Sequence, residues 1–310
     1  MKIKNETGLP QPLVAIAEKL VNEHPVFDNS VYSVTELFKS EQQAVLSRRN
    51  PDKVEMDIQD TFSMWNGTAI HNLLEDTADR NRYITEERIK EEIAPSLFIS
   101  GAFDLLDKSD WSLYDYKTTK VATYNKMMSG SDDKWLKQLY AYADMIELKF
   151  GRRPMKATII AMLTDHSKIK ASTQPGYPSN PIMQITWKLD DPELQEMFRS
   201  ERCSKAERFR HLMETGEEPE PCTYGDCWCK EDYAVIKSGS KRALKVFDNE
   251  DEARSALKGL GEGYRLFHRV SDYMNCRNYC QCRSFCKQWA RIKDNEAVCE
   301  DITDNEYIPF

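Results

Sequence analysis

The sequence predicts an α/β protein with a mixed central sheet flanked by helices, and three observations support this class. Apolar residues recur at helical spacing in several stretches, among them 60–76 and 133–150. Short runs rich in β-branched and aromatic residues lie between these stretches and are bounded by turn residues. The run 157–163 shows almost no polar alternation, as is typical of a strand in the middle of a covered sheet.

The expected elements follow one another along the first part of the chain. Helices are expected over about 13–21, from Ser33 onward, over 60–76, over 133–150 and over about 192–215. Strands are expected over 82–85, 97–104, 111–117, 157–163 and 183–189. For the second helix, the Ser33 hydroxyl is expected to cap the first turn and Glu36 to complete a capping box. This order of elements gives an α/β arrangement with a mixed sheet.

The composition changes after Pro219 and Pro221. Two short strands joined by a turn, a helix over about 251–260 and a third strand predict a small ββαβ unit. The acidic stretch at the end of the chain is expected to be a mobile tail. The sequence therefore predicts a main domain over 1–218, a cysteine-rich region with a ββαβ insert over 219–292, and an acidic tail over 293–310.

The composition excludes some classes of protein. With 43 basic and 51 acidic residues, the formal charge of −8 argues against a surface that binds phosphate everywhere, although a local basic groove remains compatible with it. No apolar run approaches the ~20 residues of a membrane-spanning helix, and the first eight residues lack the apolar run of a secretory signal. We therefore expect a cytoplasmic protein without a membrane partner. Of its nine cysteines, seven lie between Cys222 and Cys286, which favours metal binding over disulfides.

Two carboxylates and one ammonium group are expected to meet where two strands pair. Asp104 ends one expected strand, while Asp115 and Lys117 lie two positions apart on the next and so point to the same face. Carboxylate oxygens suit Mg²⁺ or Mn²⁺, which lower the pKa of a bound water and neutralise charge on a phosphodiester. Lys117 can then hold the attacking water or stabilise the pentacovalent phosphate.

These residues belong to a longer series that resembles a known family. Four motifs occur in the order and approximate spacing of RecB-like nucleases of the PD-(D/E)xK superfamily: Gly67-x-x-x-His71, Gly101-x-x-Asp104, Asp115-x-Lys117-Thr118 and Gln138-x-x-x-Tyr142. The resemblance covers about residues 30–190 and implies a restriction-endonuclease-like core.

The same resemblance implies roles for individual residues. It implies that His71, Asp104 and Asp115 bind the metal and that Lys117 assists the water. It also implies that Gln138 and Tyr142, one helical turn apart, contact DNA near the scissile phosphate. A histidine among the ligands modestly favours Mn²⁺. Weaker candidate ligands are Glu86 and Glu87.

The cysteine cluster predicts a second metal site. Cys222 and Cys276-x3-Cys280-x5-Cys286 offer four thiolates in a pattern unlike the Cys-x2-Cys pairs of ordinary zinc knuckles. Four thiolates are what a [4Fe-4S] cluster needs, and zinc is the alternative. Three further cysteines are left open as additional ligands, as part of a zinc site, or as free thiols: Cys227, Cys229 and Cys282.

The closing triplet of cysteines resembles that of a subset of RecB-like nucleases, namely the CRISPR adaptation nucleases and the AddB subunit. In those proteins the solitary first cysteine precedes the histidine motif, whereas this chain has none before Cys203. Cys222 takes that part here, as in similar phage-encoded exonucleases. The resemblance therefore implies an iron–sulfur site that orders the C-terminal region.

The expected function is a metal-dependent DNA nuclease, namely an exonuclease that acts at DNA ends in recombination, repair or replication. The alternatives are an endonuclease of the same superfamily and a non-catalytic DNA-binding or assembly protein on a nuclease scaffold. Basic side chains with interleaved aromatic ones suit single-stranded DNA or DNA ends. The basic residues are Arg48, Arg49, Lys117, Lys120, Lys126, Lys134 and Lys137, with Lys241 and Arg242 as a second possible contact, and the aromatic ones are Trp135, Tyr140 and Tyr142. No protein partner is identified.

Overall fold

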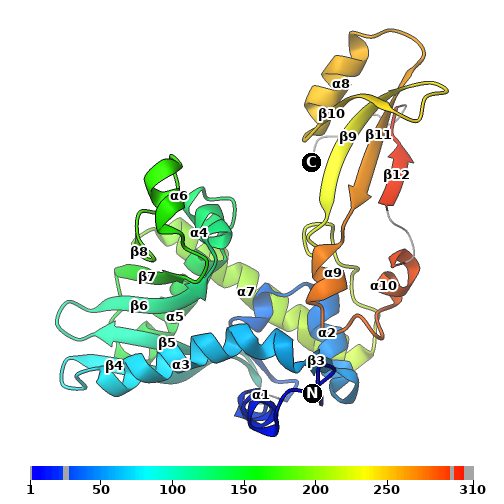
Figure 1. Cartoon of the computed structure of the whole chain (residues 1–310). Helices are drawn as coiled ribbons and strands as arrows, with labels where there is room; N and C mark the ends of the chain where they lie inside the picture. Colours follow the sequence, from blue (N-terminus) through cyan, green and yellow to red (C-terminus); the bar gives the residue numbers. More distant parts are fainter. Residues whose placement is uncertain (1, 24–27, 294–296, 304–310) are drawn as a thin grey trace. The chain divides into compact units, whose positions relative to one another are not determined.

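The computed structural model describes residues 2–23, 28–293 and 297–303 (Figure 1). The chain forms two compact units. The first, here called the sheet unit, comprises Met1–Lys39 and Glu55–Glu218, and the second, the cysteine unit, comprises Ser40–Val54 and Pro219–Phe310. The sequence predicted a single domain over 1–218, whereas in the structure the short segment 40–54 belongs to the C-terminal unit.

A six-stranded mixed sheet forms the centre of the sheet unit. Its strands are β2 (Val31–Ser33), β4 (Tyr83–Ala94), β5 (Leu97–Asp107), β6 (Ser112–Thr119), β7 (Lys156–Leu163) and β8 (Ile182–Lys188). The order is β2-β5-β6-β7-β8, with β4 also paired to β5. The β2–β5 and β6–β7 pairs are parallel and the others antiparallel. The expected mixed sheet is thus confirmed, and β7 has a strand on each side of it.

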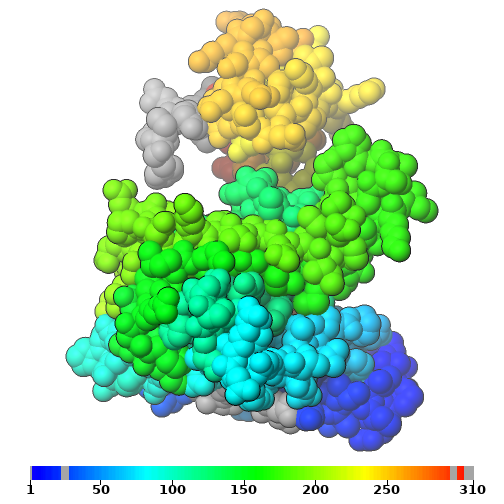
Figure 2. Space-filling view, turned by 90° about the vertical axis from the view of Figure 1, so that its left-hand side faces the viewer, coloured from blue at the N-terminus to red at the C-terminus, as the bar shows by residue number. Residues whose placement is uncertain are grey.

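Helices flank this sheet, as expected. They are α1 (Gln11–Glu23), α3 (Phe62–Thr77), α4 (Val121–Met128), α5 (Lys134–Phe150), α6 (Lys168–Thr173) and α7 (Pro192–Thr215). Helix α5 buries most of its length and ends at Gly151, whose φ of 70° suits the left-handed cap position. Its buried Asp144 pairs with Arg202 of α7, which joins the two helices. Unlike α5, helix α3 has no buried residue, and the light-blue to cyan segment that includes it lies at the surface in Figure 2.

The region around Ser33 differs from the expectation. The chain forms strand β2 there and then a short 3-10 helix, η1 (Glu36–Phe38), so the prediction of an α-helix from Ser33 is wrong. The Ser33 hydroxyl still accepts the Glu36 N–H at 3.1 Å. Three more short elements complete the unit: β1 (Lys2–Lys4), β3 (Glu55–Asp57) and η3 (Ile58–Thr61).

The cysteine unit contains an antiparallel sheet of order β10-β9-β11-β12. Its elements are α2 (Glu41–Arg49), η2 (Pro51–Lys53), β9 (Lys230–Lys237), β10 (Ala243–Phe247), α8 (Glu250–Lys258), β11 (Tyr264–Ser271), α9 (Met274–Asn278), α10 (Lys287–Ile292) and β12 (Ala297–Asp301). The expected ββαβ order occurs as β9-β10-α8-β11. The expectation of a mobile acidic tail is wrong for β12, because its backbone pairs along the free edge of β11. The last seven residues lie outside the described residues. In the part of the chain that is described, no helix has the length and apolar character needed to span a membrane.

Candidate active site and cysteine site

A fork in the sheet positions the candidate active site. Strands β5 and β6 pair only from Leu105 opposite Tyr114 to Asp107 opposite Ser112, and then diverge. Asp104 is the first β5 residue beyond this ladder. Its Oδ2 accepts the backbone N–H of Tyr116 at 2.6 Å, so a side chain replaces the next ladder hydrogen bond. The carboxylate is thereby fixed between the two strands.

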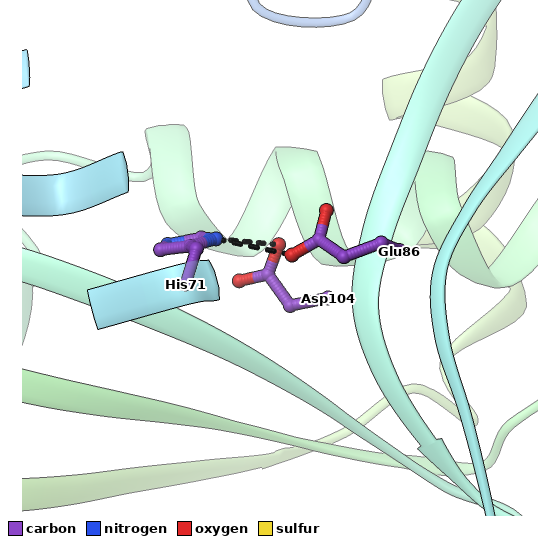
Figure 3. Close-up of side chains that lie close together, drawn as sticks. All are labelled: His71, Glu86 and Asp104. Carbon is purple, nitrogen blue, oxygen red and sulfur yellow. Dashed lines mark hydrogen bonds and ion pairs between the residues drawn. The ribbon is translucent and has the colours of Figure 1, made fainter. Parts of the chain in front are cut away.

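Three potential ligands from three elements converge at this fork (Figure 3). His71 of α3, Glu86 of β4 and Asp104 of β5 each place a ligand atom within 4.8 Å of the others. The Nδ1 of His71 lies 3.2 Å from Glu86 Oε1 and 3.6 Å from Asp104 Oδ1. Glu86 has a φ of 48°, which is uncommon for a residue other than glycine. Among the described residues, this is the one such group of possible metal ligands.

The pKa values of two of these groups show how strongly they interact. The hydrogen bond to Glu86 and the nearby carboxylates raise the pKa of His71 to about 9, against the opposing effect of burial. Burial and the nearby Asp115 raise the pKa of Asp104 to about 8. Both shifts favour the protonated forms, because burial disfavours the charge on Asp104 and the surrounding carboxylates favour the charge on His71.

Asp115 and Lys117 of β6 lie on the same face, as expected from their spacing. Asp115 is 1% exposed, and its Oδ2 lies 2.6 Å from the Nζ of Lys117. The charge of Asp115 acts on both His71 and Asp104. The carboxylate itself lies outside the converging group of three ligands and pairs with the ammonium group.

Gln138 and Tyr142 occupy the interior of the sheet unit. They are 6% and 5% exposed, and the Nε2 of Gln138 donates to the Tyr142 hydroxyl oxygen at 2.7 Å. Burial and the charge of Asp115 raise the pKa of Tyr142, so the hydroxyl stays protonated. A Cβ placed on Gly101 would lie 2.7 Å from Cε1 of Tyr142. Glycine at 101 therefore makes room for the tyrosine ring.

The two motif glycines are expected to respond in opposite ways to alanine. Gly101→Ala forces the Tyr142 ring to move and should lower the free energy of unfolding by about 1–3 kcal/mol. Gly67 lies inside helix α3, and a Cβ added there would have no atom within 4 Å. Gly67→Ala should therefore raise the free energy of unfolding by about 0.5–1 kcal/mol. Urea denaturation of both variants tests this, and equal effects would contradict the assigned packing of Gly101.

The aromatic residues expected to contact DNA are buried, and one of the expected lysines forms ion pairs. Trp135 and Tyr140 are 8% and 1% exposed, and Tyr142 is 5% exposed, so these rings offer little surface to bases of DNA. They lie on the buried helix α5, where their apolar rings contribute to the core. Lys137 of the same helix pairs with Glu201 at 2.8 Å and with Asp133 at 3.3 Å. These contacts give Lys137 structural partners, whereas Lys120, Lys126 and Lys134 are exposed.

Helix α2 supplies polar groups to the cysteine cluster. The Nε2 of Gln42 lies 3.2 Å from the Sγ of Cys286, and the Nε2 of Gln43 lies 3.8 Å from the Sγ of Cys280. From the C-terminal side, the backbone N–H of Trp289 also donates to Cys286 at 3.4 Å. Amide N–H groups thus point at the sulfurs from both ends of the chain.

The sulfurs surround a space rather than a single point. One pocket is lined by five cysteines together with side chains of α2 and α10: Cys222, Cys276, Cys280, Cys282 and Cys286. Cys227 is buried and contacts Cys222 and Cys276, which raises its pKa, whereas contact with Cys282 lowers the pKa of Cys280 to about 6. All nine cysteines are described, and none forms a disulfide.

Sequence reasoning ranked one part of these sites too low and missed another. Glu86 was only a weak candidate, because it belongs to a polar stretch and its left-handed backbone leaves no mark in the sequence. Helix α2 carries glutamines and a serine, which have no characteristic spacing relative to the cysteines. Its Ser47 hydroxyl lies 3.1 Å from the Sγ of Cys282.

One family model and one solved structure are similar to this chain. A model of the PD-(D/E)XK nuclease superfamily matches residues 34–287. No curated protein matches the chain. The chain is similar to the crystal structure of SSO0001, with 16% identity, coverage of 71% of this chain and 92% of that chain, and a TM-score of 0.49. The family match spans well over half of the sequence and includes both the fork and the cysteine cluster, and the chain therefore belongs to the PD-(D/E)XK nuclease superfamily.

Proposed function

We propose that the protein is a Mg²⁺- or Mn²⁺-dependent DNA nuclease whose active site is the fork between β5 and β6. The observation that carries this proposal is the convergence of His71, Glu86 and Asp104 beside the Asp115–Lys117 pair. Structural ion pairs usually match each carboxylate with a cation. Here three carboxyl groups and one imidazole share a single ammonium group, which favours a site for a divalent ion.

The donor set fits such an ion. Carboxylate oxygens and one imidazole nitrogen suit Mg²⁺ and, with the histidine, Mn²⁺. We propose His71, Glu86 and Asp104 as ligands, with Asp115 joining them, since a divalent cation competes with Lys117 for its carboxylate. A bound ion would polarise the phosphodiester and lower the pKa of a water. Lys117 would then position that water or stabilise negative charge on the phosphate.

Metal affinity is expected to depend on pH. Binding requires the proton-free forms of His71 and Asp104, whose pKa values are raised to about 9 and about 8. As the pH rises from 7 toward 9, fewer protons have to be displaced, so the affinity for Mn²⁺ should increase by up to about tenfold per pH unit and displaced proton. Calorimetry in buffers of different ionisation enthalpy measures both the affinity and the released protons. An affinity that stays constant over this range would contradict the assigned ligands.

For the cysteine site we propose a [4Fe-4S] cluster held by Cys222, Cys276, Cys280 and Cys286. Four of the five cysteines that line the pocket are these residues. A tetrahedral zinc site brings its sulfurs within about 4 Å of one another. Among the described residues, no three cysteine sulfurs all lie within 4.8 Å of one another, and this wider spacing supports a larger group. The amide N–H groups directed at Cys280 and Cys286 suit cluster-bound thiolates, whose potential depends on such hydrogen bonds.

We further propose that the enzyme acts as an exonuclease on DNA ends, in keeping with its resemblance to RecB-like phage exonucleases. End-labelled linear single- and double-stranded DNA and covalently closed circles of each kind, incubated with Mn²⁺, test this directly. An exonuclease degrades the linear substrates and spares the circles. Cleavage of circles identifies an endonuclease, and lack of metal-dependent cleavage of every substrate refutes nuclease function. EDTA should stop the reaction.

A further inference from the structure

The cysteine unit exposes a pair of aromatic side chains that its core does not use. Trp228 is 52% exposed and Tyr279 is 58% exposed. Their ring centroids lie 5.3 Å apart, and the ring planes are tilted by 50°. Large aromatic side chains usually bury most of their surface, because this burial contributes strongly to stability. Two adjacent exposed rings therefore indicate a binding surface.

The backbone holds Trp228 in an unfavourable conformation. Its φ is 51°, in the left-handed region that a bulky residue rarely adopts. Hydrogen bonds fix this turn: the Trp228 N–H donates to Gly225 O at 3.1 Å, and the Met274 N–H donates to Trp228 O at 3.4 Å. The same contacts tie the turn to helix α9, next to Tyr279. Glycine or asparagine would fit this backbone better, so the tryptophan ring has a use outside packing.

The segment that carries Tyr279 is strongly basic. Residues 273–293 contain five lysines and arginines and no acidic residue, although the whole chain has a formal charge of −8. Arg277 and Arg283 are both exposed. They flank the tyrosine in sequence, and the Nη1 of Arg283 donates to Arg277 O at 2.7 Å, which holds the two together. The surface beside the rings thus complements a polyanion.

We infer that Trp228 and Tyr279 form a platform for unpaired bases of single-stranded DNA, with Arg277 and Arg283 contacting the phosphates. This inference rests on the proposed function, since it specifies a contact for the DNA substrate. Bases of a single strand can turn to meet two tilted rings, whereas duplex bases are stacked parallel and hide their faces. Stacking tolerates any sequence, because every base has a π face.

Binding of a fluorescent oligothymidylate to the full-length protein in EDTA tests the platform without cleavage. Trp228→Ala and Tyr279→Ala should each weaken the binding by about tenfold, while Trp228→Phe and Tyr279→Phe keep an aromatic face and most of the affinity. Binding of duplex DNA should change much less. The control is Leu244→Ala, which removes a similarly exposed apolar side chain (57%) from β10 of the same unit.

The phosphate contacts have their own signature in the salt dependence. Each lost contact should reduce the slope of log affinity against log salt by about 0.7 for a single strand. The double variant Arg277→Gln/Arg283→Gln should therefore lower the slope by about 1.4. Lys258→Gln, which removes an exposed charge from α8 of the same unit, should leave the slope unchanged.

The outcomes separate this inference from the proposed function. If both alanine variants bind single strands as tightly as the parent, the inference is overturned. The same result is expected if the two rings bind another protein and not DNA. Cleavage by the unmodified enzyme with Mn²⁺ is a separate measurement. Ring-dependent binding without cleavage would refute the proposed nuclease function and support the platform. Normal cleavage with binding that ignores the rings would refute only the platform.

Discussion

Asp115→Asn should reduce DNA cleavage by at least about 1,000-fold while the protein remains folded. The substitution keeps the size of the side chain and removes the negative charge that interacts with Lys117 and with a divalent cation. The bound cation stabilises the transition state by several kcal/mol. Lys117→Met should cost about 100- to 1,000-fold, since it removes one positive group near the phosphate. The free energy of unfolding should change little with Asp115→Asn, because loss of the ion pair with Lys117 is offset by the loss of repulsion between Asp115 and Asp104.

A matched carboxylate on the preceding strand provides the control. Asp107 of β5 is also buried at 2% exposure, and Arg82 Nη2 donates to its Oδ2 at 2.6 Å, which lowers its pKa. Asp107→Asn should therefore destabilise the protein and leave the turnover of folded molecules unchanged. Single-turnover cleavage and urea denaturation on all three variants measure the two effects separately. Parent-like cleavage by Asp115→Asn would refute the assigned site.

Cys280→Ala should abolish the proposed cluster and loosen the cysteine unit. The anaerobically purified parent is expected to be brown, with broad absorbance near ~400 nm, and the variant colourless. Metal-site energies of about 10 kcal/mol exceed the net stability of many domains. Because Gln43 contacts Cys280, proteolysis should become faster in two places, beyond residue 219 and within 40–54. Metal binding at the fork should persist.

Cys299→Ala is the control for this experiment. Cys299 is exposed on β12 and does not line the cysteine pocket, so its loss should change neither colour nor protease resistance. Limited proteolysis with mass mapping locates the cuts. If the parent protein is colourless and contains stoichiometric zinc, the site binds zinc and not an iron–sulfur cluster. A Cys280→Ala variant as resistant as the parent would show that no metal stabilises this unit.

The main helices and central strands could be predicted because their apolar patterns are regular. β7 is a continuous apolar run and α7 combines a cap at Asp191 with proline at its first turn, so both were located closely. The length of strand β4 was underestimated, because its second half is rich in Glu and Lys and has the composition of a solvated loop. The short elements β2 and β12 form only because β5 and β11 offer edges for pairing, and no local pattern encodes that.

The candidate site was predicted where spacing implies geometry. Side chains two positions apart on a strand point to the same face, so the Asp115–Lys117 pair could be predicted from the sequence alone. The position of Glu86 could not be predicted from such spacing. It lies opposite Asp104 and has an irregular backbone conformation, which directs its side chain toward His71. The buried positions of Trp135 and Tyr140 were missed because a helix between a sheet and another helix has two covered faces.

The membership of α2 in the cysteine unit has a consequence for biosynthesis. Its side chains contact sulfurs 235 to 244 residues further along the chain. At about 5–20 residues per second, a ribosome needs roughly 10–50 s between making this helix and making its partners. During that interval the helix remains without its final neighbours while the flanking segments can already fold into the sheet unit. Expression of 1–218 alone would leave it in that state permanently, so an isolated catalytic fragment requires replacement of 40–54 by a short linker.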